Sequence, residues 1–265
     1  MRFSGLLFLV MAFASCQKEC PTCEIPECKD SIPPTKPTCS IDLTKGLLAY
    51  YPFNGNLNDE SGNSLHGTAV NGAYLTSGFL GRPNSAAGFD GIDDYIMVQD
   101  NGKLTTDSVS ISLFVMARSV DRRHAIVSRV NFDNTTSLAW GVGQSLDGIN
   151  KWEFAVGNAA DACSKAHIYD PSIYCTSTQS LVGGQWYHLI TSFVNGVQKI
   201  YVDGVLKATI NRDFKTLKKC TTAQFIIGGW WKGDITSIDG KVDEVRVYNR
   251  GLSDCEIMEL SKTFN

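Results

Sequence analysis

The sequence predicts an all-β fold, a sandwich or barrel of antiparallel strands with one short helix at the C-terminus. Three observations lead to this prediction. Runs of β-branched and aromatic residues recur at short spacing, each bounded by Gly, Asn or Asp. Asn195-Gly196 and Asp203-Gly204 are typical of two-residue type I′ hairpin turns. Only the segment from Leu252 onward has the pattern of a helix.

The composition of the chain fits a folded domain and excludes some partners. It has 265 residues, 43% of them hydrophobic, and a formal net charge of −3. So many apolar residues can form a sizeable core and argue against wholesale disorder. The charge is too near neutral to indicate binding to nucleic acid or to an anionic membrane surface.

The N-terminus reads as an export signal. A short basic start precedes an apolar run, Phe3 to Ala14, that is too short to span a bilayer. The ending FASC resembles a bacterial lipobox, in which the cysteine is lipidated and becomes the mature N-terminus. We expect residues 1–15 to be a lipoprotein signal peptide and Cys16 to carry the lipid. The alternative is ordinary secretion, with Cys16 as one more thiol.

Residues 16–41 are predicted to form a tether. Five of the eight prolines and four of the nine cysteines lie in 17–39, and proline disfavours helix and sheet alike. We find no second linker and no repeat of about 20 to 50 residues in the remainder. Residues 42–265 are therefore predicted to be one domain.

The cysteines indicate disulfides in an oxidising compartment. Apart from Cys16, they form a tether set and a body set: Cys20, Cys23, Cys28 and Cys39; Cys163, Cys175, Cys220 and Cys255. Each set can pair within itself, and four cysteines allow three connectivities that the sequence does not distinguish. Our working assignment is Cys163–Cys175 and Cys220–Cys255. Zinc in the tether is disfavoured, because only one pair there has the C-x2-C spacing.

Eight strands are predicted in the body. Short apolar and aromatic runs give five of them, and the two hairpin turns separate the other three. The predicted strands are 47–53, 94–98, 109–117, 137–143, 152–157, 186–194, 197–202 and 205–210. In the C-terminal helix, Ser253 can serve as N-cap, and Glu256 three residues later completes a capping box.

Five segments occur in the order of a known family: LLAYYPFNGNLNDESGNSLHG, AGFDGIDDYIMV, VSISLFVMA, GGQWYHLITSFVNGVQKIYVDG and GKVDEVRVYNRGLSDCEI. From Gly46 to Leu260 the chain resembles the LamG-like jellyroll domain of the concanavalin A-like lectin/glucanase superfamily. The resemblance implies a jelly-roll sandwich of two antiparallel sheets and extracellular binding as its usual activity. Phe114 stands where the family commonly has tryptophan, which implies a core change only. The insertion 158–180 is expected to be a surface loop.

The acidic residues are interpreted as structural rather than catalytic. Asp90, Asp93 and Asp94 lie between two strand-like pieces, where short carboxylates accept backbone N–H bonds in turns. Glycosidases need two carboxyl groups facing one cleft, and the acidic strand E-x-D-x-x-E of superfamily glucanases is not found. Adjacent Asp243 and Glu244 should point to opposite faces of a strand. We therefore predict that the protein is not an enzyme.

A structural calcium site is implied by the resemblance. Ca²⁺ takes about six to eight oxygen ligands, and the Gly-containing loop NDESGNSLHG offers several. In the family, this loop lies beside the aspartate of the late G-x-V-D-E-V strand. That implies Asp59 and Asp243 as side-chain ligands, with Asn63 and His66 contributing backbone oxygens. The alternative is an Asx turn and a strand-end aspartate without metal.

Trp230 and Trp231 are the candidate ligand-binding residues. Sugars stack on aromatic rings and bond to nearby polar groups. If IIGGWWKGD is extended, the two rings face opposite ways, so that one is buried and the other is available for stacking. The alternative is that both rings serve packing.

These observations predict a non-catalytic, lipid-anchored protein of the bacterial cell envelope, at the outer membrane, whose β-sandwich binds carbohydrate or a cell-surface protein. A glycan-active hydrolase and an inert structural subunit of an envelope assembly are the two alternatives.

Overall fold

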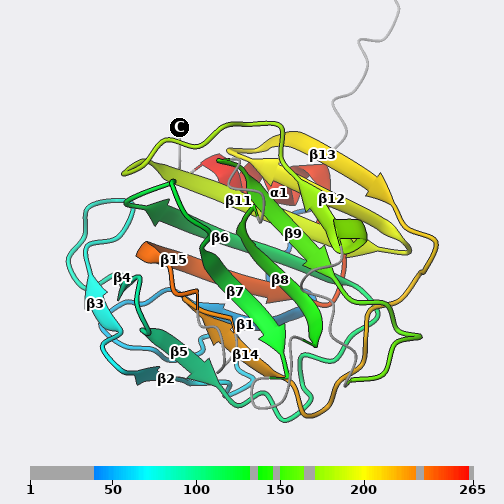
Figure 1. Cartoon of the computed structure of the whole chain (residues 1–265), viewed down its shortest axis with the longest axis horizontal. Coiled ribbons are helices and arrows are strands. Elements are labelled where there is room, and N and C mark those ends of the chain that lie inside the picture. The colour runs from blue at the N-terminus through cyan, green and yellow to red at the C-terminus, as the bar shows by residue number, and fades with distance from the viewer. Residues whose placement is uncertain (1–38, 132–136, 146–149, 164–170, 231–235, 263–265) are drawn as a thin grey trace, which may run out of the picture. The chain divides into compact units, whose positions relative to one another are not determined.

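Two antiparallel sheets pack face to face, as the sequence predicts. The computed structural model describes residues 39–131, 137–145, 150–163, 171–230 and 236–262. Figure 1 shows β7, β8 and β9 of one sheet crossing in front of β6 and β15 of the other. The signal peptide, Cys16, most of the tether and Trp231 lie outside the described residues. Within the described ranges, no helix is both long and apolar enough to cross a membrane.

The first sheet, sheet A, has eight strands. In spatial order they are β13 (Val205–Asn211), β12 (Val197–Val202), β11 (Trp186–Val194), β6 (Val109–Ala117), β15 (Asp239–Tyr248), β4 (Ala86–Asp90) and β3 (Tyr74–Thr76), with β1 (Leu47–Tyr51) paired to β15. The two predicted hairpins join β11, β12 and β13, and Asn195 and Asp203 take the positive φ, 48° and 52°, that type I′ turns require.

The second sheet, sheet B, has seven strands. In spatial order they are β10 (Tyr174–Thr176), β9 (Trp152–Val156), β8 (Leu138–Gln144), β7 (Ala125–Val130), β14 (Gln224–Ile227), β5 (Tyr95–Val98) and β2 (Gly67–Val70). The insertion 158–180 is therefore more than a surface loop. It contributes β10, preceded by a 3-10 turn at Pro171–Ile173, because Ile173 and Cys175 are apolar enough to be buried there.

The core lies between the sheets and follows the two-residue alternation of the strands. In β6, Ile111, Leu113 and Val115 face the core, whereas the intervening residues face the outer side of sheet A. Trp140 and Trp152 supply large buried rings from sheet B. Burial of this apolar surface is the main stabilising contribution to such a sandwich.

Helix α1 (Asp254–Ser261) covers part of the outer side of sheet A, and Figure 1 shows it behind β11 and β12. The predicted capping box is confirmed: Ser253 Oγ accepts from the N–H of Glu256, and the Glu256 carboxylate accepts from the N–H of Ser253. Ile257 and Leu260 pack against the sheet. So short a helix depends on this packing and capping, because isolated helices of this length are unstable.

The disulfides differ from the working assignment. The structure pairs Cys39 with Cys255 and Cys163 with Cys220, so the expected pairs Cys163–Cys175 and Cys220–Cys255 are wrong. Cys175 lies in β10 opposite Phe154 and is fully buried as a thiol. Its burial raises the pKa of the thiol to about 11. The Cys39–Cys255 bond crosses the two sets, and Cys39 belongs to the same compact unit as the body.

Candidate functional site

The candidate site lies where β15 changes its partner strand. β15 pairs with β4 up to Val242 and with β1 from Val245 onward, while β6 runs along its other edge. Between Asp243 and Arg246 the register with β6 shifts, and Glu244 has a φ of 52°. Such a bulge re-aims side chains and interrupts the alternation of faces. The expectation that Asp243 and Glu244 serve opposite faces is therefore wrong, because both line one cavity.

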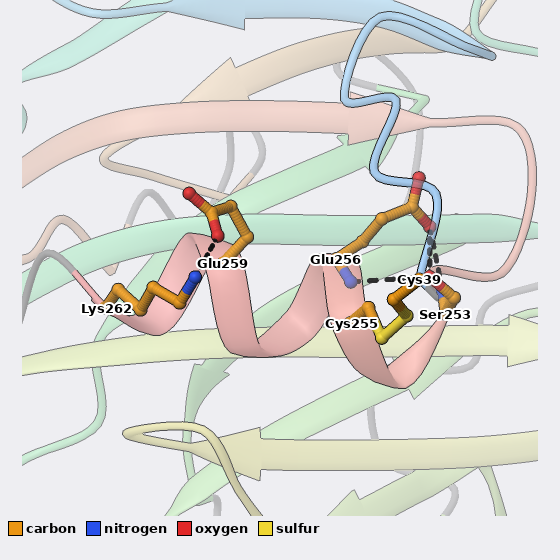
Figure 2. Close-up of a disulfide and its surroundings, with 6 residues drawn as sticks. All are labelled: Cys39, Ser253, Cys255, Glu256, Glu259 and Lys262. Atoms are coloured by element: carbon orange, nitrogen blue, oxygen red, sulfur yellow. Dashed lines mark hydrogen bonds and ion pairs between the residues drawn. A yellow bond between two sulfur atoms is a disulfide. The ribbon is translucent and has the colours of Figure 1, made fainter. Parts of the chain in front are cut away.

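The cavity has a volume of about 390 Å³, within the size range of small-molecule sites. Residues from β1, β15, the 79–85 segment, helix α1 and the N-terminal strap (Cys39–Lys45) surround it. The lining residues are Leu43, Tyr50, Pro52, Asn54, Phe79, Leu80, Arg82, Ser85, Phe114, Asp243, Glu244, Arg246, Glu259 and Leu260. Figure 2 shows the disulfide that joins the strap, at Cys39, to α1, at Cys255, so one wall of the cavity is covalently tied.

Asp243 is almost completely buried at the bulge. One carboxylate oxygen accepts from the N–H of Glu244 at 2.7 Å and the other from the N–H of Phe79 at 3.2 Å. Burial outweighs these hydrogen bonds and raises the pKa of Asp243 to about 7. The side chain is therefore partly protonated near neutral pH.

Glu244 belongs to a polar cluster that joins β1 to β15. Its Oε2 accepts from the Tyr50 hydroxyl at 2.9 Å and forms an ion pair with the Arg246 guanidinium at 2.7 Å. The guanidinium also lies 4.0 Å from the centre of the Tyr50 ring, a cation–π geometry. Tyr50 and Arg246 are opposite each other in the strand register. The cluster fixes three polar side chains along the cavity wall.

Aromatic rings form the apolar side of the cavity. Phe79 stacks on Phe114 with ring centroids 3.9 Å apart, and Phe114 stacks on His188 at 4.4 Å. Phe114 thus lines the cavity outside the interior core, and its presence in place of tryptophan is more than a core change. His188 bonds to the hydroxyls of Ser112 and Ser261. Its burial lowers the pKa to about 3, which keeps the ring neutral as a strand residue.

Three of the residues proposed for calcium, Asp59, Asn63 and His66, share a hydrogen-bond network, and the fourth, Asp243, is not part of it. The Asp59 carboxylate accepts from the N–H groups of Tyr50, Ser61 and Leu65 and from the Ser61 hydroxyl. Asn63 donates to backbone carbonyls of β1, and His66 Nδ1 accepts from the N–H of Asp59. This loop covers the outer edge of β1.

Asp243 bonds elsewhere, to Phe79 and Glu244, and no hydrogen bond or ion pair between described residues joins it to the Asp59 loop. Donors already fill both oxygens of Asp59, which is the pattern of the Asx-turn alternative and a poor fit to a cation. Calcium binding itself stays a prediction.

The other acidic group, Asp90, Asp93 and Asp94, forms the turn that the sequence predicts. It connects β4 of sheet A to β5 of sheet B. Asp90 accepts from the N–H of Ile92, and Asp94 accepts from the N–H of Asp90. Oxygens of the three carboxylates lie within 4.8 Å of one another, but Asp90 and Asp93 are exposed. Hydrogen bonds within the turn account for Asp90, and Asp94 accepts from Asp90 and from Gly72.

The Trp230 ring is buried. It is only 3% exposed and packs with Ala125, Leu138 and Ala155 on sheet B. The Arg123 guanidinium lies 5.3 Å from the centre of the ring. Trp230 therefore offers no exposed face for stacking, and Trp231 lies outside the described residues.

Sequence reasoning missed Tyr50, Phe79, Arg82 and Arg246 as site residues. One signal for the bulge was present in the strand DGKVDEVRVY: the buried valines at 242, 245 and 247 are spaced by three and then by two residues. A regular strand keeps a spacing of two, so the extra residue marks the place where the acids change direction.

Residues 90–258 match the family model described as the concanavalin A-like lectin/glucanases superfamily. Among solved structures, domain 4 of AbnA, a GH43 extracellular arabinanase from Geobacillus stearothermophilus in complex with arabinotriose, is 22% identical with a TM-score of 0.58. That match covers 82% of this chain and 98% of that domain. No curated protein sequence matches the chain significantly.

Receptor-binding domains of botulinum neurotoxins are also similar. The mosaic serotype C/D domain is 14% identical with a TM-score of 0.61, over 84% of this chain and 52% of that one. The binding domain of neurotoxin DC in complex with SialylT is 15% identical with a TM-score of 0.59, over 84% and 53%. This chain spans about half the length of the toxin domains. At these identities the likeness shows the fold.

Proposed function

The chain belongs to the concanavalin A-like lectin/glucanases superfamily, and from this premise we propose that it is a non-catalytic carbohydrate-binding module. Its ligand site is the cavity at the β15 bulge. The proposal draws support from the similar domains, whose structures include a complex with arabinotriose and one with SialylT. A cell-surface protein is the second kind of partner, since another similar toxin domain is in complex with rat synaptotagmin II.

The observation that carries the proposal is the mixture of groups on the cavity wall. Phe79 and Tyr50 present partly exposed rings, and Asn54 and Arg82 are exposed polar side chains at the same cavity. Sugars are recognised by ring faces for their C–H groups and by polar groups for their hydroxyls. The fixed Tyr50–Glu244–Arg246 cluster reduces the entropy lost when a ligand binds.

The carboxylates of the cavity are held in a way that suits binding better than catalysis. Both oxygens of Asp243 accept backbone hydrogen bonds, and Glu244 is ion-paired. A general acid or nucleophile must reach the scissile bond. These contacts fix the carboxylates of Asp243 and Glu244 against the protein, so that they do not extend toward a ligand.

A glycan-active hydrolase is the second candidate, favoured by one observation. Asp243 and Glu244 line the same cavity, and the pKa of Asp243 is about 7, a value that suits a general acid near neutral pH. Release of reducing ends from a polysaccharide by the purified protein, lost in Asp243→Asn, would establish the hydrolase.

The cellular setting belongs to the same proposal and rests on the N-terminal sequence. A lipid on Cys16 and the proline-rich tether would hold the body at a bacterial outer membrane. Metabolic labelling with a fatty-acid analogue, lost in Cys16→Ser, tests the anchor.

A glycan array tests the binding function, run with calcium and repeated with a chelator. We expect the wild-type protein to bind at least one class of glycan and Arg246→Met to lose those signals, because this variant removes the ion pair and the cation–π contact. The matched control is Arg122→Met, at the 90–94 turn, where Arg122 donates to the carbonyl of Gly91. An array without hits, or hits that both variants retain, contradicts the proposal.

A further inference from the structure

The edge strand β3 presents an exposed aromatic ring on the outer side of sheet A. Tyr74 of β3 lies opposite Gly88 of β4, which lies opposite Lys241 of β15. In the neighbouring row, Ala87 and Val242 belong to the interior core, so the row of Tyr74 faces outward. In Figure 1, β3 lies at the far edge of the sheet from β13. Tyr74 is 46% exposed, so its ring is accessible from solvent.

The ring lies with one face against Gly88. A Cβ added to Gly88 would lie 2.6, 2.8 and 3.0 Å from Cζ, Cε2 and Cε1 of Tyr74. Because these three adjacent ring atoms are nearly equidistant, the glycine lies under the face of the ring and not beside its edge. Any side chain at this position would displace the ring. The glycine therefore lets the phenol lie flat on the sheet, with its other face toward solvent.

Arg118 and Asp239 fix the hydroxyl end of the ring. Arg118 Nη2 donates to the Tyr74 hydroxyl at 3.3 Å, and Nη1 forms an ion pair with Asp239 Oδ1 at 2.5 Å. The Arg118 N–H also donates to the Asp239 carbonyl at 2.8 Å. Among the described residues, the Tyr74 O–H has no acceptor and Asp239 Oδ2 has no donor. One donor and one acceptor are thus available beside a flat ring, and we call Tyr74, Gly88, Arg118 and Asp239 the Tyr74 platform.

These groups define the chemistry of the ligand. A sugar stacks the C–H groups of one ring face on an aromatic ring, while its hydroxyls bond to polar groups nearby. A purely apolar ligand would take Asp239 Oδ2 out of water without offering it a donor, which is unfavourable. The ion pair cancels the charges of Arg118 and Asp239, which favours a neutral sugar over an acidic one.

We propose that the Tyr74 platform is a second carbohydrate site, which stacks one neutral sugar unit on the Tyr74 ring and accepts a sugar hydroxyl at Asp239 Oδ2. The choice of a carbohydrate ligand rests on the proposed function. The location is independent of it, because Tyr74, Arg118 and Asp239 do not line the sheet A cavity at the β15 bulge. The protein would then bind glycan at two separate places.

Fluorine NMR of 3-fluorotyrosine-labelled protein tests this proposal. The probes are arabinotriose and methyl glucopyranoside at millimolar concentrations, with sodium glucuronate as the acidic comparison, and Tyr74→Phe assigns the Tyr74 signal. We expect both neutral sugars to shift this signal and glucuronate to bind no tighter than the glucopyranoside. In Gly88→Ala the added Cβ displaces the ring, so the affinity read from the Tyr74 signal should fall by about tenfold. Leu206→Ala is the matched control, because Leu206 is 47% exposed at the other edge strand of sheet A.

The same spectra separate this site from the sheet A cavity. Tyr50 lines that cavity, and Tyr50→Phe assigns its signal. A shift of the Tyr74 signal without a shift of the Tyr50 signal supports the platform even if the sheet A cavity binds no glycan. An unchanged Tyr74 signal with both neutral sugars, whether or not Tyr50 shifts, would overturn the Tyr74 platform. Tighter binding of glucuronate, or equal affinity in Gly88→Ala and the wild type, would overturn it as a stacking site for neutral sugar.

Discussion

Two acidic groups of this protein are similar in sequence and differ in structure. Asp90 accepts a hydrogen bond from its own turn, and Asp94 accepts from Asp90 and from Gly72 on the preceding loop. Asp243 and Glu244 accept hydrogen bonds from Phe79 and Tyr50, residues 164 and 194 positions away in the chain. Asp90 and Asp93 are exposed, whereas Asp243 is buried beside a cavity. Carboxylates therefore become candidate ligand-binding groups when the fold holds them through distant strands.

The largest expected effect comes from removing the Cys39–Cys255 disulfide, which ties one wall of the cavity. The disulfide Cys39–Cys255 spans 216 residues, and the variant with both cysteines replaced by serine should lose about 3–5 kcal/mol of unfolding free energy. Because Leu43 of the strap and Leu260 of α1 line the cavity, glycan affinity should fall too. Urea denaturation and calorimetric titration measure the two effects.

The second disulfide provides the control. Cys163–Cys220 closes a shorter loop, with a separation of 57 residues, and neither of its cysteines is among the described residues that line the sheet A cavity. Serine at both positions should lower stability by a similar or smaller amount while glycan affinity is retained. Equal loss of affinity in both double variants would show that the cavity wall has no special dependence on Cys39.

Replacing Glu244 at the β15 bulge should cost more stability than replacing an aspartate at the 90–94 turn. Glu244→Ala leaves the Tyr50 hydroxyl and the Arg246 guanidinium without their shared acceptor, which should cost about 2–3 kcal/mol of unfolding free energy. Asp93→Ala, at the exposed turn, should change it by less than about 0.5 kcal/mol. Urea denaturation of both variants measures the two changes in unfolding free energy. Equal losses would show that the carboxylates of the bulge and of the turn do not differ in this respect.

The raised pKa of Asp243 predicts a pH dependence. Folding favours its protonated form, so this contribution to stability is complete below the unfolded pKa, near 4, and is lost as pH rises through about 7. Between pH 5 and 8 the wild type should lose about 2 kcal/mol relative to Asp243→Asn. Parallel pH profiles of unfolding free energy for the two proteins would show that Asp243 ionises normally.

The smallest effect is expected from calcium removal. Donors already occupy the Asp59 carboxylate, so EDTA should change the melting temperature little. A fall of several degrees that added calcium reverses would establish the metal site implied by the family resemblance and would require the Asp59 loop to rearrange.

Local patterns predicted much of this fold because the interactions behind them are local. The hairpin turns at Asn195 and Asp203 and the capping box of Ser253 and Glu256 each depend on neighbouring residues. Strands such as β2, β3 and β10 are only three or four residues long, too short for a readable alternation.

The site required contacts that sequence order does not contain. Cys39 reaches Cys255 because the strap and α1 meet on the outer side of sheet A, and Tyr50 meets Arg246 because the first and last strands pair. The irregular spacing of the valines in β15 indicates the bulge at Asp243. The cavity beside the bulge also depends on Phe79, Phe114 and α1, which the sequence order does not bring together.

The most direct measurement is calorimetric titration of the array's tightest glycan into the wild type, Tyr50→Phe and Asp93→Asn. If the β15 bulge forms the ligand site, Tyr50→Phe should weaken affinity by about tenfold, the loss of one hydrogen bond to a charged group, while Asp93→Asn binds like the wild type. Unchanged affinity in Tyr50→Phe, or weakening only in Asp93→Asn, would contradict a ligand site at the bulge.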